Sequence, residues 1–447
     1  MASLPAGPPT PLTLRSHRAG ARFTCGAGRV VSAYVPSVVS VLTRHRDFRR
    51  LFGAELVVFG GDWFAVIPLM ALLLDLTGRG LWGSLALAAD TAVLALLLPY
   101  AGTVADRLDR RRILVTTSLA ALVAVVVLLA VRSPGVAWLG PVAIGILGAA
   151  KAFYTPAALA ALPNLVPQED LSTANAIAGS AWGTMLVVGA SLGGVMTVLV
   201  GPYACFLITA GCLLLATYLV WRIRAPMQAG RPAEPVPALR ALREALGYIR
   251  RRPRVLSLVT VKSAVGVGNG LLATFPLLAA AFGAGPIGTG LLFAARGLGA
   301  LAGPLLLRRV LLRRSWLLPG LAISMAGYGL AYLGVSVSPW FALTLGLVIV
   351  AHLAGGGNWT MSNYALQLEV PDALRGRVFA TDMMIATLAI SASLLVVGAL
   401  VDVLELRVLI AGCASATLLY AIGWRLVTRR LNAPAAAPAG QPGAAGA

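Results

Sequence analysis

Charged and titratable side chains inside long apolar runs are the residues of this sequence that could do chemistry. Five of them lie near the middle of such runs: Asp62, Asp90, Lys262, Arg296 and His352. A charge in that position costs at least ~2.5–3.5 kcal/mol on insertion scales, so it usually faces a cavity or a partner. We expect these residues to contact a substrate or to carry protons. The alternative for each is a satisfied polar contact between packed helices.

Membrane-spanning helices must position these residues. The chain has 447 residues, of which 58% are hydrophobic and 12% charged, whereas a soluble domain has roughly 25% charged residues. Its apolar runs are long enough to cross a bilayer core of ~30 Å as helices, and they lack the alternation of barrel strands. We predict twelve spans, at about 52–76, 81–101, 113–131, 136–154, 173–200, 203–221, 255–282, 287–307, 316–337, 340–360, 378–403 and 406–427.

The basic residues predict the topology. The net charge is +20, and 30 of the 36 Lys and Arg residues fall on one side of the predicted spans. The other side holds Arg79, Arg132 and Arg407. The positive-inside rule then places both termini in the cytoplasm of a multi-pass cell-membrane protein. The basic side is expected to contact anionic lipid headgroups, and nucleic acid is not an expected partner.

The chain repeats itself at an interval of about 201 to 204 residues. Gly102 and Arg107 recur as Gly303 and Arg308 at the end of the eighth span. Two parallel six-helix repeats are typical of transporters in which one half rocks against the other. The predicted domains are a cytoplasmic tail (1–47), an N-terminal half (48–221), a cytoplasmic linker (222–252), a C-terminal half (253–430) and a disordered tail (431–447).

Four segments carry a family resemblance. "GTVADRLDRRR", at 102–112, resembles the loop signature of the major facilitator superfamily, in which Gly is followed by Asp-Arg and a basic cluster. Segments 48–64, 153–177 and 368–380 look like its macrolide-efflux and siderophore-export branch. The resemblance implies the twelve-helix major facilitator fold and export of a small amphipathic drug, antibiotic or siderophore-like molecule. It further implies alternating access and proton antiport.

The same resemblance assigns a gate to the 102–112 loop. In the family, the carboxylate corresponding to Asp106 faces the start of the eleventh helix, where a negative charge gains ~0.3–1 kcal/mol. We expect such a contact to hold the cytoplasmic gate shut. The predicted gate residues are Gly102, Asp106, Arg107 and Arg111. The loop departs from the family at Asp109, where Gly is usual, and the second copy has Leu307 in place of an acid.

The resemblance also predicts a central cavity between the first and seventh spans. Asp62 and Lys262 lie about ten and nine residues into these equivalent spans, and we hypothesise an ion pair between them that substrate or a proton breaks. A purely structural pair and two unconnected charges are the alternatives. Further candidate cavity residues are Trp63, Phe153, Tyr154, Asn269, Trp359 and Asn363, although Trp and Tyr are also common membrane-interface anchors.

Other charged residues are expected to be peripheral. Lys151 is expected to extend toward the cytoplasmic interface, and Asp382 lies only four residues into the eleventh span. Asp75, Asp402 and Glu405 are assigned to the outer interface, where water solvates them.

Enzymatic chemistry is not expected. The G-x-S-x-G match at 189–193 lies in an apolar helix without an evident relay, and 266–270 lacks the features of a phosphate loop. No catalytic, metal or cofactor site is predicted, so an ion gradient or facilitated diffusion must drive transport. The expected partners of the monomer are a small-molecule substrate, protons and the bilayer. The alternatives are an importer or lipid-precursor flippase of the same fold, or a non-transporting membrane scaffold or sensor.

Overall fold

The computed structural model describes residues 39–228, 237–306 and 316–432. Twelve helices in these ranges are long and apolar enough to cross a membrane, and the described part of the chain contains no strand. The prediction of an all-helical, twelve-span membrane protein is therefore confirmed.

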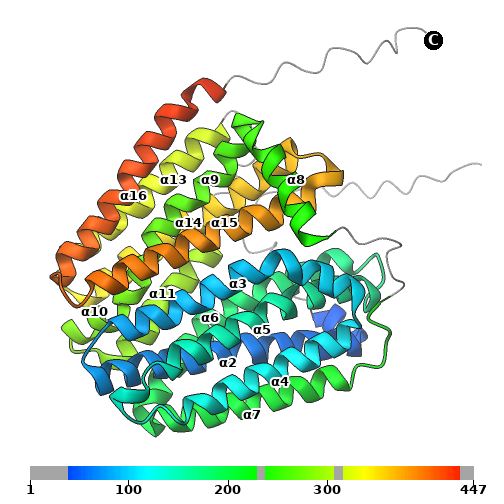
Figure 1. Ribbon diagram of the computed structural model, residues 1–447, viewed down its shortest axis with the longest axis horizontal. Helices are drawn as coiled ribbons and strands as arrows, with labels where there is room; N and C mark the ends of the chain where they lie inside the picture. Colours follow the sequence, from blue (N-terminus) through cyan, green and yellow to red (C-terminus); the bar gives the residue numbers. More distant parts are fainter. Residues whose placement is uncertain (1–38, 229–236, 307–315, 433–447) are drawn as a thin grey trace, which may run out of the picture.

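The first six spans form one lobe, drawn at the bottom of Figure 1. Its helices are α2 (Arg46–Thr77), α3 (Leu81–Arg107), α4 (Arg110–Leu128), α5 (Leu139–Ala161), α6 (Leu171–Val200) and α7 (Pro202–Trp221). Within the lobe, α2 packs against α6 and α7, while α5 packs against α3 and α4.

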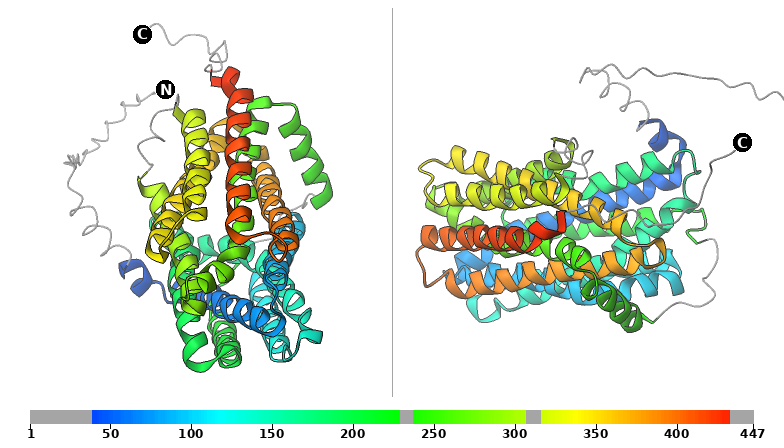
Figure 2. Two further views of the ribbon diagram at one scale, coloured as in Figure 1. Left: turned by 90° about the vertical axis from the view of Figure 1, so that its left-hand side faces the viewer. Right: turned by 90° about the horizontal axis from the view of Figure 1, so that it is seen from above.

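The last six spans form the second lobe. They are α9 (Pro253–Gly268) with α10 (Phe275–Ala281), then α11 (Gly285–Leu306), α13 (Leu317–Ser336), α14 (Phe341–Glu369), α15 (Asp372–Leu400) and α16 (Leu406–Thr428). The left view of Figure 2 shows the late-chain helices as a bundle above the early ones, and in the right view, from above, the two sets overlie each other.

The seventh span is interrupted, although the sequence predicted a continuous helix at 255–282. A 3-10 turn, η3 (Asn269–Thr274), separates α9 from α10. Gly266, near the end of α9, and Gly270, in η3, allow the chain to approach α15 closely. A Cβ on either residue would clash with α15. The Gly270 N–H donates to the Ser393 hydroxyl at 3.1 Å, so α15 supplies an acceptor at the break.

The lobes meet along two helix pairs, α3 with α15 and α6 with α11. We call the end of the molecule where α3 meets α4 (residues 107–112) the basic end. The end where α2 meets α3 (78–80) and α15 meets α16 (401–405) is the opposite end. In Figure 1 the lobes converge toward the opposite end, near α10, and diverge toward the basic end, near α8.

Small residues allow the close approach at the opposite end. A Cβ on Gly194 of α6 would lie 2.6 Å from the Pro286 carbonyl oxygen of α11. A Cβ on Gly398 of α15 would lie 2.6 Å from Cβ of Ser84 on α3. Backbones this close gain van der Waals contact that larger side chains would prevent, so the halves are in direct contact there.

The two halves are not closely packed at the basic end. A Cβ at Gly102 would have no neighbouring atom within 4 Å among the described residues, and Leu96 and Tyr100 on the same helix are largely exposed. The linker helix α8 (Ala238–Arg250) packs against α9 and α15 at this end and touches α3. Its Glu244 pairs with Arg377 of α15. The basic ends of α3 and α15 are therefore apart in this conformation.

Candidate functional site

Three charged side chains meet in the middle of the first lobe. The Lys151 ammonium on α5 lies 3.0 Å from Oδ2 of Asp62 on α2 and 2.7 Å from Oδ1 of Asp90 on α3. All three side chains are mostly buried. One ammonium between two carboxylates leaves a formal charge of −1 when both acids are ionised. We refer to Lys151, Asp62 and Asp90 as the charge triad.

This arrangement corrects two predictions. Asp62 does not pair with Lys262; its partner is Lys151, which does not extend to the interface. Lys262 lies in the second lobe, where it pairs with Asp382 of α15 and donates to Oδ1 of Asn363 at 2.7 Å. A buried charge is costly unless it is paired, and for these two lysines each lobe supplies the acid from its own helices.

The ring of Trp359 completes the surroundings of Lys262, with its centroid 5.0 Å from Nζ. Lys262 and Asp382 are almost fully buried, whereas Trp359 and Asn363 are half-buried. Two predicted cavity residues, Trp359 and Asn363, therefore contact Lys262. Asp382 belongs to the same cluster.

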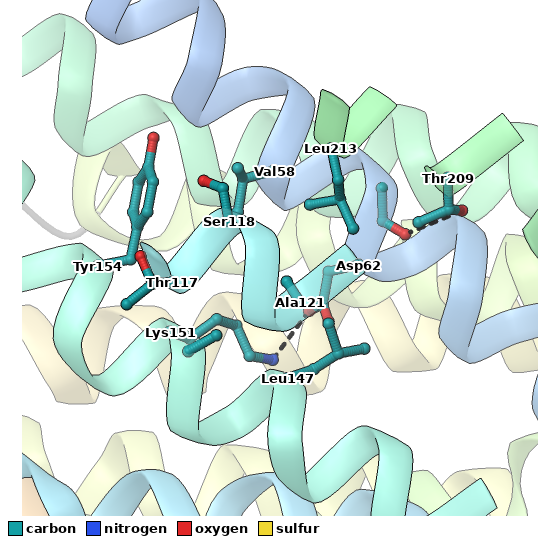
Figure 3. Close-up of a pocket in the computed structure, with 12 residues that line it drawn as sticks. Val58, Asp62, Thr117, Ser118, Ala121, Leu147, Lys151, Tyr154, Thr209 and Leu213 are labelled. Atoms are coloured by element: carbon teal, nitrogen blue, oxygen red, sulfur yellow. Dashed lines mark hydrogen bonds and ion pairs between the residues drawn. The ribbon is translucent and has the colours of Figure 1, made fainter. Parts of the chain in front are cut away.

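A small cavity lies beside the charge triad, between α2, α4, α5 and α7 (Figure 3). Its polar lining residues are Asp62, Thr117, Ser118, Lys151, Tyr154 and Thr209, and its free space admits water-sized groups. Oδ1 of Asp62 and the Tyr154 hydroxyl are buried and lack a hydrogen-bond partner among the described residues. Buried polar atoms of this kind are ordinarily satisfied by water, for which the cavity offers space and hydrogen-bonding partners.

The structure also buries an acid that the sequence pattern did not indicate. Glu55 on α2 is 6% exposed and has no ion pair among the described side chains. It lies two helical turns before Asp62, on the same side of the helix. Its seven-residue spacing from Asp62 was the available signal, but Glu55 lies near the predicted start of the first span and was not singled out.

Aromatic residues close the space between the lobes on the side of the opposite end. The ring of Phe293 on α11 lies 5.2 Å from that of Trp63 on α2 and 5.0 Å from that of Phe275. All three side chains are buried. Trp63, predicted to line a cavity, instead packs in this conformation into what we call the aromatic plug.

Arg296 lies one helical turn from Phe293, toward the basic end. Its guanidinium carbon is 5.7 Å from the ring centroid of Trp182 on α6. The neighbouring side chains of the second lobe include His352, whose Nε2 is 2.9 Å from the Tyr332 hydroxyl. The Tyr328 hydroxyl donates to Oδ1 of Asn269 at 3.4 Å. His352 thus makes the contact between packed helices given above as its alternative, and Asn269, a predicted cavity residue, bonds to Tyr328 instead.

The remaining predicted cavity and gate residues lie nearer the basic end. Phe153 is half-buried, and Tyr154 is buried against the first lobe. Arg111 donates to the Ala225 carbonyl at 3.2 Å. Arg107 ends α3 and is exposed, as is Gly102.

The proposed contact of Asp106 with α15 lies outside the described residues, because the side chain of Asp106 is not among them. Asp109 is explained: its carboxylate accepts from the Arg112 N–H at 2.9 Å and caps the start of α4. This cap accounts for an acid where the family usually has Gly.

A carboxylate joins the two halves at the opposite end. Asp402, which follows α15, accepts from the Gly80 N–H at 2.7 Å and the Leu81 N–H at 3.3 Å, at the start of α3. Arg79 lies 3.5 Å from the same carboxylate. Asp402 is exposed at this end, as expected for a residue of the outer interface, but its carboxylate also bonds to the protein. Its partners are backbone groups of the other half, which the sequence pattern does not identify.

Comparisons with known proteins agree with this architecture. The model of the Major Facilitator Superfamily matches residues 56–277. An uncharacterized MFS-type transporter of Mycobacterium bovis is 29% identical over 75% of this chain and 80% of its own length. The multidrug efflux pump Tap of Mycolicibacterium fortuitum is 26% identical over 78% of this chain and 88% of its own.

Solved structures share the fold at low sequence identity. A POT family transporter in complex with a thioalcohol-conjugated peptide aligns with a TM-score of 0.70, at 10% identity over 87% of this chain and 97% of its own. A bacterial homologue of the human lysosomal transporter Spinster aligns with a TM-score of 0.67, at 14% identity over 88% of this chain and 99% of its own.

Proposed function

The chain belongs to the major facilitator superfamily, and we propose that it exports a small amphipathic organic molecule across the cell membrane in exchange for protons. The observation that carries this proposal is the charge triad, in which two buried carboxylates share one lysine beside a hydroxyl-lined cavity. The multidrug efflux pump among the relatives supports export of a drug-like substrate.

The contacts between the halves support alternating access. The opposite end is sealed by close helix packing, the aromatic plug and Asp402, while α3 and α15 are apart at the basic end. If the basic end is cytoplasmic, as the positive-inside rule predicts, this conformation receives substrate from the cytoplasm. Rocking of the lobes would then open the opposite end and close the basic end.

The charge triad offers a means of coupling. A proton that binds to Asp62 or Asp90 cancels the excess negative charge of the triad and leaves one carboxylate paired with Lys151. Neutral groups are cheaper to hold inside the membrane, so protonation would favour movement of the lobes. Release of the proton on the other side would restore the three-charge arrangement and reset the transporter.

Proton flux in proteoliposomes tests this function. The full chain is reconstituted around a pH-sensitive dye, and ethidium or fluorescein is added as an amphipathic cation or anion. We expect at least one probe to drive proton movement, and Asp62→Asn to abolish it. The matched control is Asp75→Asn, which alters an exposed acid near the far end of the same helix.

If neither probe moves protons, or if Asp62→Asn matches the wild type, the proposed antiport is refuted. Probe movement without proton movement would indicate a uniporter, and complete absence of movement a scaffold.

A further inference from the structure

Arg296 faces the interior between the two halves. The exposed side of α11 is a stripe of Leu291, Leu298 and Leu305, which are 39%, 46% and 70% exposed. At 100° per residue, Phe293 and Arg296 lie on the other side of the helix. Phe293 is buried in the aromatic plug. Arg296 is therefore directed into the same interior space, one turn from the plug toward the open basic end.

Trp182 reaches this space from the other half. Along α6, Met185 and Leu186 follow Trp182 by one turn on the same side of the helix. Met185 contacts Gly60 of α2, and Leu186 contacts Gly297 of α11. Trp182 thus lies over the gap between α2 and α11 and is 43% exposed. Its indole ring and Arg296 form a cation–π contact between the halves. This contact lies on the side of the aromatic plug that faces the basic end.

No acid of the described part of the chain pairs with Arg296. The other two cations in the middle of the membrane, Lys151 and Lys262, each have carboxylate partners. Among the described residues, Arg296 has no ion pair or hydrogen bond, and its contact is with the Trp182 ring. An arginine inside a membrane is retained where a partner or function compensates its cost. The geometry leaves its N–H donors available to a group that enters from outside the protein.

Two tyrosines in this region, Tyr328 and Tyr332, do not occupy the N–H donors of Arg296. The rings of Tyr328 and Tyr332 pack against His352, which meets α11 at Gly299, one turn beyond Arg296; both tyrosines are fully buried and bonded to Asn269 and His352. They form a neutral wall behind the arginine.

A guanidinium binds a carboxylate through two parallel hydrogen bonds, and an exposed indole face stacks on flat apolar groups. A single unpaired arginine balances a monoanion, whereas a dianionic phosphate would leave one charge uncompensated.

We propose that Arg296 and Trp182 form the substrate-binding subsite, and that the transported molecule carries a carboxylate next to a flat apolar body. This inference rests on the transporter function proposed above and names the chemical class of its substrate. The aromatic plug would cover the bound molecule until the opposite end opens.

Equilibrium binding to the purified full chain in detergent tests the proposal. The probes are 1-naphthoate and 1-naphthamide, which share one ring system and differ in charge. We expect the wild type to bind the carboxylate roughly 10- to 100-fold more tightly, as for a charge-assisted hydrogen bond. Arg296→Gln should remove this preference, and Arg296→Lys should restore part of it. Trp182→Leu should weaken both probes.

The matched control is Arg132→Gln, because Arg132 also lies over an aromatic ring, that of Tyr203, but outside the interior space. This variant should keep the wild-type preference. Equal binding of the two probes by the wild type, or an unchanged preference in Arg296→Gln, would overturn the proposal. Melting temperatures without probe show whether each variant is folded.

This binding assay separates the inference from the proposed antiport. Naphthoate binding that depends on Arg296, without proton flux in proteoliposomes, would refute antiport and leave the subsite standing. Proton flux driven by ethidium, with no effect of Arg296→Gln on naphthoate binding, would refute the subsite and leave antiport standing.

Discussion

Removal of the Asp402 carboxylate should open the opposite end of the transporter. Asp402 accepts two N–H groups at the start of α3, so it acts as a helix cap supplied by the other half of the molecule. Loss of a cap costs ~0.5–2 kcal/mol, and loss of a negative charge near a helix N-terminus costs a further ~0.3–1 kcal/mol. The two terms add to about 0.8–3 kcal/mol, so if this contact exists only while the opposite end is closed, Asp402→Ala should shift the open-to-closed ratio by roughly 4- to 160-fold.

Cysteine labelling can measure this shift. Ser84 is fully buried where α3 meets α15, and Ser84→Cys places a thiol there. With the four native cysteines replaced, the rate of reaction with a membrane-impermeant maleimide should follow the open fraction. We expect Asp402→Ala to raise that rate by at least about fourfold, in the range worked out above.

Glu405→Ala is the matched control. Glu405 also caps a helix, accepting from the Arg407 and Val408 N–H groups at 3.2 Å, but both partners belong to its own half. Its removal should lower the melting temperature without changing the labelling rate. An unchanged rate in Asp402→Ala, or an equal increase in Glu405→Ala, would refute the reasoning that Asp402 holds the halves together.

Three further predictions concern packing and buried polar pairs. Gly194→Ala should raise the same labelling rate, because its Cβ would lie 2.6 Å from a carbonyl oxygen of α11 and force the halves apart; an unchanged rate would contradict this. Tyr332→Phe should lower the free energy of unfolding by about 1–3 kcal/mol, because it leaves buried His352 without its 2.9 Å partner. Lys262→Met should lower it by about 3–5 kcal/mol, because the Asp382 charge stays buried; additional Asp382→Leu should recover most of the loss. Chemical denaturation in detergent measures both values, and equal stability of the single and double variants would contradict the last prediction.

The sequence was sufficient for the architecture. The apolar runs and the repeat that relates Gly102 to Gly303 predicted twelve helices in two halves, and the structure has both features. The hydrophobic length of a span is a local property of the chain, which is why it can be read without knowing the neighbours. The break at Asn269 was not predictable in this way, because it depends on close packing against α15 and on an acceptor from Ser393.

The sequence likewise identified most of the charged residues in the middle of the membrane but not their partners. Asp62 was matched to Lys262 because the two occupy equivalent spans, yet the structure pairs Asp62 with Lys151 and Lys262 with Asp382. Which side chains meet depends on the rotation of each helix about its axis and on the neighbours within its lobe. Neither quantity is encoded in spacing along a single span.

By itself, then, the sequence determined that this protein crosses the membrane twelve times, because only long apolar helices can pair their own backbone groups in lipid. It also showed which residues carry an unfavourable charge there. Tertiary structure alone decided that Arg296 faces Trp182 with no acidic partner among the described residues, and that Asp402 links the two halves at the opposite end. These features arise from contacts between helices more than 100 residues apart, and only the packed molecule specifies such contacts.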